Sequence, residues 1–248
     1  MNKIDNELLL RKQTWEKKKI LRRIYHQWYS YIHFYLKDGR TFEVSSGFGN
    51  FKEYYPKCIT SDIMFNPWVD MVADAMQLPL KSESITNLVC IDGLHHLENP
   101  YLFLSEAQRV LKEGGRLIFF EPYLSPFAYL IRKLFHHEDI NKYSEFSMSK
   151  TPLEANLAIP TLIFCKKFEN FQNEFPRLKL IHKSLHDLFL YPLSGGFHRK
   201  SLIPYWCYNP MQFLEKILTP LNRFFAFKIF LVFEKQRDTG MIRKLGGD

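Results

Sequence analysis

The sequence predicts an α/β fold built on a mainly parallel sheet. Short apolar segments alternate with helical segments between residues 41 and 122, and small or polar residues follow the ends of the apolar segments. The chain has 248 residues, of which 46% are hydrophobic, so one domain with a sizeable core is expected. A charged share of 24% and a low count of 11 glycines exclude wholesale disorder and collagen-like or linker-like chains.

Residues 5–36 contain neither Pro nor Gly and carry apolar residues at helical spacing, which predicts one long amphipathic helix. This helix forms an N-terminal extension over residues 1–38. Its Lys and Arg residues lie mainly between positions 11 and 23. We therefore expect the half around Ile24 to Tyr35 to pack on the main domain, beside its binding pocket. The basic half is expected to stay more exposed, where it allows peripheral contact with an anionic membrane surface.

Four short strands are predicted in the next part of the chain. The connection between the second and the third is too short for a crossover helix, so a single turn is expected there. The segments are TFEV (41–44), CITSD (58–62), VDMVAD (69–74) and ITNLVCID (85–92).

The remaining elements complete a main domain over residues 39–238. We expect residues 123–176 to be an insertion that covers a binding site, and residues 239–248 to be a frayed tail. The predicted elements are a helix over 101–115, a strand over 116–122, a helix over 123–135, a strand over 177–185, a loop over 191–197, a helix over 210–221 and a strand over 224–236.

Charge and cysteine content limit the function classes. Lys and Arg number 34 against 26 Asp and Glu, a formal net charge of +8 that suits a phosphate-bearing partner, an anionic membrane surface or an acidic substrate. The four cysteines form no CxxC pair, so we expect no structural zinc and a reducing, cytoplasmic location. The cluster over residues 136–139, His-His-Glu-Asp, is interpreted as a solvated loop, and no metal site is predicted. Apolar runs are too short for a transmembrane helix.

Polar and small residues gather at the ends of the predicted strands. Glu43 to Asn50 read Glu-Val-Ser-Ser-Gly-Phe-Gly-Asn, a strand that runs into a small-residue turn where the backbone can approach a ligand closely. Asp62 and Asp74 end the next two strands, where a carboxylate can accept hydrogen bonds from a ribose diol or an adenine amine. Asp92, His95, His96 and Glu121 follow two further strands. In open α/β sheets ligands bind at this edge.

With these motifs in this order, the chain resembles class I S-adenosylmethionine-dependent methyltransferases, in the branch called the type 11 methyltransferase domain. The resemblance rests on Glu43, the turn with Gly47 and Gly49, Asp62, and three segments: Asp74 to Pro79, Leu94 to Leu97, and Arg109 to Gly115. It covers residues 40–122 closely. It implies a Rossmann-like, doubly wound, seven-stranded sheet with an antiparallel last strand. Ser45 departs from the pattern, because the family has Gly there.

The resemblance also implies roles for individual residues. S-adenosyl-L-methionine would be the cofactor and S-adenosyl-L-homocysteine the product. The implied cofactor-binding residues are Glu43 for the methionine amino group, Ser45, Gly47 and Gly49 for the methionine moiety, Asp62 for the ribose, Ile63, Asp74 and Ala75 for the adenine, and Asp92 and Leu94 near the sulfonium. His95 and His96 are the candidates for a catalytic base.

Several functions fit this pattern. In such an enzyme residues 123–210, which include the predicted insertion over 123–176, would form the acceptor side. They are rich in aromatic residues, which favours a small-molecule, saccharide or lipid-linked acceptor over nucleic acid. An RNA methyltransferase, a non-catalytic S-adenosylmethionine-fold module and a nicotinamide-dependent oxidoreductase are the alternatives. The Asp-Ala-x-x-Leu-Pro segment argues against the last of these.

Overall fold

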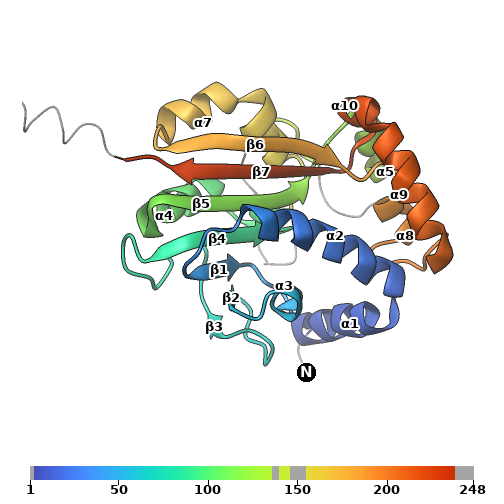
Figure 1. Cartoon of the computed structure of the whole chain (residues 1–248), viewed down its shortest axis with the longest axis horizontal. Coiled ribbons are helices and arrows are strands. Elements are labelled where there is room, and N and C mark those ends of the chain that lie inside the picture. Colours follow the sequence, from blue (N-terminus) through green and yellow to red (C-terminus); the bar gives the residue numbers. More distant parts are fainter. Residues whose placement is uncertain (1–2, 136–139, 146–154, 238–248) are drawn as a thin grey trace, which may run out of the picture.

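The computed structural model describes residues 3–135, 140–145 and 155–237, and its sheet confirms the predicted fold class. Seven strands lie in the order β3-β2-β1-β4-β5-β7-β6 (Figure 1). The first five run parallel, whereas β7 is antiparallel to both β5 and β6. The strands are β1 (Thr41–Val44), β2 (Cys58–Asp62), β3 (Met71–Val72), β4 (Ile85–Ile91), β5 (Leu111–Pro122), β6 (Leu178–His186) and β7 (Lys228–Lys235).

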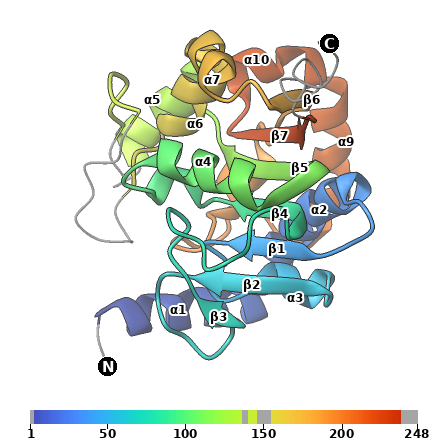
Figure 2. The same cartoon turned by 90° about the vertical axis from the view of Figure 1, so that its left-hand side faces the viewer.

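Helices cover both faces of the sheet. Figure 2 shows α4, α6 and α7 on one face, with α2, α3 and α9 on the other. The longer helices are α1 (Lys3–Lys17), α2 (Lys19–Tyr35), α4 (Pro100–Val110), α5 (Pro126–Phe135), α7 (Phe168–Glu174) and α9 (Tyr208–Ile217). Shorter ones are α3 (Asn50–Tyr54), α6 (Ile159–Thr161), α8 (Leu190–Ser194), α10 (Asn222–Phe225) and the single turns η1 (Leu94–His96), η2 (Leu162–Lys166), η3 (Tyr205–Cys207) and η4 (Thr219–Leu221).

The apolar stripe of α2 forms much of the core on its side of the sheet. Trp28 is 1% exposed and stacks on Phe120 of β5, with ring centroids 4.7 Å apart. Tyr29 and Ile32 are fully buried beside it. Burying large side chains contributes about 1.5–3 kcal/mol each, so α2 is firmly held on the sheet. On the opposite face Phe103, Phe164 and Phe171 and their neighbours form the second core cluster.

The single helix predicted over residues 5–36 is wrong, because the chain breaks at Lys18. The backbone of Lys18 leaves the helical region (φ −96°, ψ 82°), and its ammonium donates to the carbonyl oxygens of Gly196 and Arg199, at 2.6 Å each. The break lets α1 turn back toward the carboxyl ends of the parallel strands, which point to the right in Figure 1. As expected, the half around Ile24 to Tyr35 holds more buried residues than the basic half, in which Lys17, Lys19 and Arg23 are exposed. The basic half nevertheless packs on the domain through Trp15 of α1, which is 1% exposed.

Three further boundaries differ from the prediction. Leu111 to Gly115 continue strand β5 rather than helix α4, because Leu111 pairs with Ile85 and Gly114 takes a left-handed conformation (φ +71°). The predicted loop over 191–197 contains helix α8, which Gly195 ends with a left-handed cap. Strand β3 is only two residues long. The predicted tail over 239–248 and the cluster over 136–139 lie outside the described residues.

Within the described part of the chain, no helix combines the length and hydropathy needed to cross a bilayer.

Candidate functional site

A cavity of about 1650 Å³ opens at the carboxyl ends of β1, β2 and β4, beneath α1, α5 and α8. In Figure 1 these helices gather at the end of the sheet to which the parallel strands point. Ten of the site residues predicted from the sequence line this cavity. These are Glu43, Ser45, Gly47, Asp62, Ile63, Asp74, Ala75, Asp92, His95 and His96.

The turn after β1 presents bare backbone to the cavity. Ser45 and Gly47 both take left-handed conformations, with φ of 53° and 55°. A Cβ atom added to Gly47 would meet no atom within 4 Å, so this position leaves open space on the cavity side. Ser45 takes the strained conformation expected from its departure from glycine. Gly93, which the sequence analysis missed, packs so closely on Ser45 that an added Cβ would lie 2.6 Å from the Ser45 Cβ atom.

Glu43 is a buried carboxylate at the floor of the cavity. It is 2% exposed, and its Oε2 atom has no hydrogen-bond partner among the described residues. Burial raises the pKa of Glu43 to about 8, and the nearby Asp62 carboxylate adds to the rise. An unpaired buried acceptor is costly, and a ligand ammonium or hydroxyl would satisfy it.

Asp62 fixes the turn from the end of the neighbouring strand β2. Its Oδ2 atom accepts from the Gly47 N–H at 2.7 Å, and its Oδ1 atom accepts from the Met64 N–H at 2.9 Å. Burial raises the pKa of this carboxyl, while those two N–H groups and Arg11 work against the rise. Each oxygen keeps a second lone pair, so the carboxylate still offers acceptors to a diol in the cavity.

The next two segments form the adjacent wall. Asp74 accepts from the Met76 N–H at 2.8 Å, which makes it a turn residue as well as a lining residue. Ile63 is 48% exposed, and Ala75 is buried beside Asp74. These side chains offer an apolar surface with one polar edge.

Two nominated residues do not line the cavity. Gly49 caps α3 in a left-handed conformation, and an added Cβ would lie 2.7 Å from the Trp68 carbonyl oxygen, so its place is structural. Leu94 is fully buried in the hydrophobic core. The geometry therefore does not support direct contact of a cofactor with Gly49 or with the Leu94 side chain.

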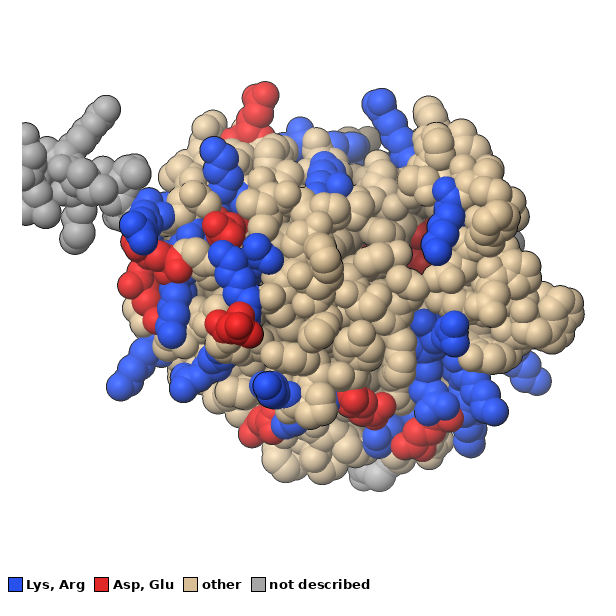
Figure 3. Space-filling view, in the orientation of Figure 1, with Lys and Arg blue, Asp and Glu red and all other residues tan. Residues whose placement is uncertain are grey.

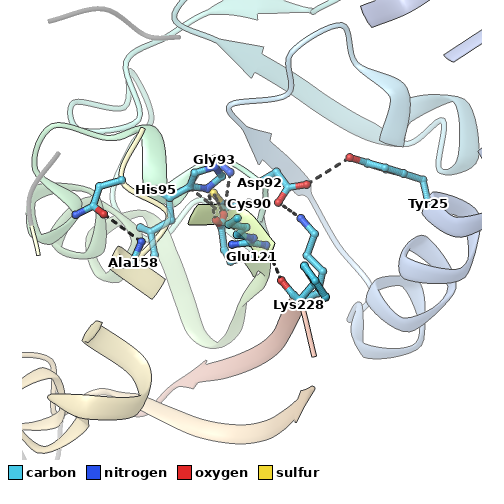
Figure 4. Close-up of polar contacts among 12 residues, drawn as sticks. Tyr25, Cys90, Asp92, Gly93, His95, Glu121, Ala158 and Lys228 are labelled. Atoms are coloured by element: carbon cyan, nitrogen blue, oxygen red, sulfur yellow. Dashed lines mark hydrogen bonds and ion pairs between the residues drawn. The ribbon is translucent and has the colours of Figure 1, made fainter. Parts of the chain in front are cut away.

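Asp92 anchors a polar cluster at the end of β4 (Figure 4). Its carboxylate forms an ion pair with the Lys228 ammonium and accepts from the Tyr25 hydroxyl at 3.3 Å. Burial alone would raise the pKa of Asp92, but the Lys228 ammonium and His95 hold it below its usual value. Lys228 begins β7 and interrupts the apolar run over 224–233, and a lysine in such a run is the signal that could have identified it.

His95 and Glu121 form a second pair in the same cluster. The two side chains are 4% and 0% exposed, and His95 Nδ1 lies 2.8 Å from Glu121 Oε2. Glu121 Oε1 accepts from the Gly93 and Leu94 N–H groups at 2.8 and 2.9 Å. Glu121 therefore favours the tautomer with the proton on Nδ1, which leaves Nε2 as the acceptor.

Ligand atoms of Asp92, His95 and Glu121 all lie within 4.8 Å of one another, a spacing that would suit a metal ion. Asp92 is paired with Lys228, and both Glu121 oxygens have protein partners. The arrangement is thus satisfied as a hydrogen-bonded network without an ion.

The other half of the cavity is predominantly apolar. The predicted insertion contributes through α5 and the segment before α6, and the α8 region forms the opposite wall. The apolar lining residues are Phe127, Ile131, Leu157, Leu188, Phe189, Leu193, Leu202 and Phe227. The sequence analysis missed a third wall, which Glu7, Leu8 and Arg11 of α1 supply.

Part of the chain is similar to known methyltransferases. Residues 51–119 match the family model described as a methyltransferase domain. A demethylmenaquinone methyltransferase of Streptomyces griseus is 33% identical over 78 residues, which cover 28% of this chain and 34% of that protein. The chain thus spans about a third of the length of this curated relative.

Solved structures share the fold over most of the chain. A SAM-dependent methyltransferase of Thermotoga maritima has a TM-score of 0.56 and 17% identity, covering 91% of this chain and 94% of that one. A SAM-dependent methyltransferase of Archaeoglobus fulgidus has a TM-score of 0.55 and 12% identity, covering 87% and 94%. At these identities the likeness supports the fold.

Proposed function

We propose that this chain, which carries a class I methyltransferase domain, is an enzyme that transfers a methyl group from S-adenosyl-L-methionine to a small-molecule or lipid-linked acceptor. One observation carries the proposal: the unpaired, buried Glu43 carboxylate lies beside the bare Gly47 backbone and Asp62, at the carboxyl ends of adjacent strands. An aminoacyl nucleoside needs an acceptor for its ammonium, room beside the backbone and an acceptor for its ribose.

The residues present fit this cofactor. Glu43 would hold the amino group, Asp62 the ribose hydroxyls, and Ile63, Asp74 and Ala75 the adenine side. When bound, S-adenosyl-L-methionine supplies a methyl group that its sulfonium already activates. The protein then has to align the acceptor with that methyl group and exclude water.

His95 is the residue proposed to take a proton from a hydroxyl acceptor. Glu121 holds its Nδ1 side, so the ring is oriented and Nε2 remains the basic atom. His96 also lines the cavity and adds a second imidazole at the same edge. Lys228 keeps Asp92 ionised, so the Asp92 carboxylate stays a hydrogen-bond acceptor at the edge of the cofactor pocket.

The acceptor half supports an apolar substrate. Its walls are aromatic and aliphatic, with polar groups at the strand ends and basic groups such as Lys200 at the opening. A lipid-linked or other apolar small-molecule acceptor fits these walls, whereas an RNA would need an extended basic groove.

Calorimetry tests the cofactor assignment. We expect the protein to bind S-adenosyl-L-methionine and not NAD, and Asp62→Asn to weaken that binding by about 1.5–3 kcal/mol. Asn is chosen over Ala because it keeps the size of the side chain and one acceptor oxygen for the Met64 N–H, although the Gly47 N–H loses its acceptor. The assignment would fail if the folded Asp62→Asn variant bound the cofactor as well as the parent protein does.

His95→Gln and Glu121→Gln test the base. Both variants should bind the cofactor normally, and turnover of a hydroxyl acceptor should fall by about 10²–10⁴-fold in His95→Gln. Unchanged turnover in His95→Gln would remove this residue from the chemistry.

A further inference from the structure

Helix α9 turns its polar side toward the protein and its apolar side toward the solvent. Its polar residues Gln212 and Glu215 face the protein: Gln212 donates to Gln27 of α2, and Glu215 accepts from three backbone N–H groups at the start of α8. Its apolar residues Phe213 and Ile217 face outward and are 66% and 58% exposed. A helix in contact with water normally shows the opposite arrangement.

The outward residues form one stripe that continues past both ends of α9. Leu214, Ile217, Leu221 and Phe224 are spaced by three or four residues from α9 through η4 to α10, and Trp206 lies seven residues before Phe213. We call this the outer stripe; its members are Trp206, Phe213, Leu214, Ile217, Leu221 and Phe224. Exposed apolar patches of this extent mark binding surfaces.

Helix α5 extends the outer stripe toward the cavity. The rings of Phe127 and Phe225 lie 5.3 Å apart, which joins α5 to α10. Leu130 and Leu134 of α5 are 52% and 63% exposed, while Phe127 and Ile131 of the same helix line the cavity. Leu202 is 77% exposed and also lines the cavity. Exposed apolar residues therefore lie both on the helices next to the outer stripe and at the cavity.

The described charged residues at the border of the outer stripe are basic. Residues 188–233 contain a single acidic residue, Glu215, and its carboxylate accepts backbone hydrogen bonds on the inner side of α9. Lys216, Arg223 and Lys133 are exposed at the border of the stripe. The Arg23 guanidinium packs 4.9 Å from the Tyr208 ring, which brings the basic side of α2 next to α9. In Figure 3 the right-hand part of the molecule, where Figure 1 places α9 and α10, is mainly uncharged with Lys and Arg around it.

We propose that the outer stripe docks this protein onto an anionic lipid bilayer, with the mouth of the cavity at the membrane surface. A stripe that carries Trp and large aliphatic side chains within a basic border matches the interfacial region of such a bilayer: the apolar groups enter the acyl boundary and the cations meet the headgroups. Within residues 5–36, the segment predicted for this contact, the apolar side of α2 is buried against the sheet and is not available to enter the bilayer. That the acceptor enters the cavity from the bilayer rests on the proposed function; the docking itself does not.

Vesicle binding tests the docking. The full chain should co-sediment with vesicles of equal parts phosphatidylcholine and phosphatidylglycerol, and the Trp206 emission should shift to the blue. The variant Trp206→Ser/Phe213→Ser/Ile217→Ser should bind these vesicles at least about tenfold more weakly. The matched control Phe34→Ser/Leu102→Ser changes exposed apolar residues away from the stripe and should bind as the parent does.

Charge reversal tests the border. Lys216→Glu/Arg223→Glu should reduce binding to the anionic vesicles about tenfold or more, and added salt should weaken binding of the parent. Lys57→Glu/Lys81→Glu, with the same charge change elsewhere on the surface, should have a clearly smaller effect. Equal effects of the two pairs would show a response to net charge alone and would overturn the assignment to this surface.

Calorimetric affinity for S-adenosyl-L-methionine separates this inference from the proposed function. Stripe variants that bind the cofactor normally but not vesicles support the docking. Absence of vesicle binding by the parent protein overturns it, as does a self-associated form in sedimentation velocity that stripe variants convert to monomer without any vesicle binding. A protein that binds vesicles but no cofactor would contradict the proposed function and leave the docking supported.

Discussion

The ammonium of Lys228 and the carboxylate of Asp92 form an ion pair at the wall of the cavity, across the ends of strands β7 and β4. The two partners are buried to different degrees: the Lys228 side chain is 2% exposed and the Asp92 side chain 24%. Lys228 Nζ also lies 4.8 Å from the Trp28 ring and 5.0 Å from the Tyr191 ring. The ion pair thus joins α2 and α8 to the sheet edge that carries the site.

This difference in burial predicts an asymmetric response to mutation. Asp92→Asn leaves a buried ammonium without its counter-charge and should destabilise the protein by about 3–5 kcal/mol. Lys228→Met leaves a carboxylate that reaches the cavity and its water, so its cost should be smaller. Urea unfolding at neutral pH measures both. In the double variant the loss should be well below the sum of the single losses. Additive losses would show that the pair is not coupled.

The pH dependence of cofactor binding should report on Glu43. Because burial raises the pKa of Glu43 to about 8, a proton must leave the carboxyl below that pH before it can pair with an ammonium. An α-amino group itself loses its charge above about pH 8. Affinity should therefore be greatest near pH 8 and fall by up to about tenfold per unit toward pH 6. Calorimetry in buffers of different ionisation enthalpy should detect the proton released.

Glu43→Gln is the control for that profile. Its affinity should be lower and nearly independent of pH between 6 and 8.

The stability of the parent protein should depend on pH in the opposite sense to its affinity for the cofactor. Since the folded-state pKa of Glu43 lies above its usual value of 4.5, the folded protein holds a proton that the unfolded chain has lost. Stability is therefore lost as pH rises from about 4.5 to about 8. Glu43→Gln should lack this loss and melt at a higher temperature than the parent at pH 8.

The two glycines of the turn after β1 should respond differently to substitution. Gly47→Val should fold with a cost of about 1–2 kcal/mol for its left-handed backbone, since its Cβ meets no protein atom, but should bind no cofactor. Gly49→Ala places a Cβ 2.7 Å from a backbone carbonyl and should lose stability more than ligand affinity at temperatures where it is folded. Thermal melts and calorimetry distinguish the two. Normal cofactor binding by Gly47→Val would place the ligand elsewhere.

Local patterns in the sequence predict the sheet well and its surroundings poorly. Strands β1 and β2 begin and end where predicted, because apolar runs bounded by turn residues are local signals. The break at Lys18 depends on tertiary hydrogen bonds to Gly196 and Arg199, which no local pattern encodes. The ion pair of Asp92 with Lys228 likewise joins residues that only the antiparallel return of β7 brings together. Strand-end acids were therefore predictable, and their partners were not.

Helix α1 should act as a cover over the cofactor half of the cavity. Its Trp15 is 1% exposed and donates from Nε1 to Glu53 Oε2 at 2.8 Å, and Arg11 of the same helix is close enough to influence the Asp62 carboxylate. Trp15→Ala should cost about 3–5 kcal/mol of stability and release α1 from the domain. Cofactor affinity should then fall even at low temperature, where the variant remains folded, because the wall formed by Glu7, Leu8 and Arg11 is lost. Leu10→Ala, at an exposed position of the same helix, should change neither quantity. If Trp15→Ala bound the cofactor with the affinity of the parent protein, α1 would support the fold without covering the site.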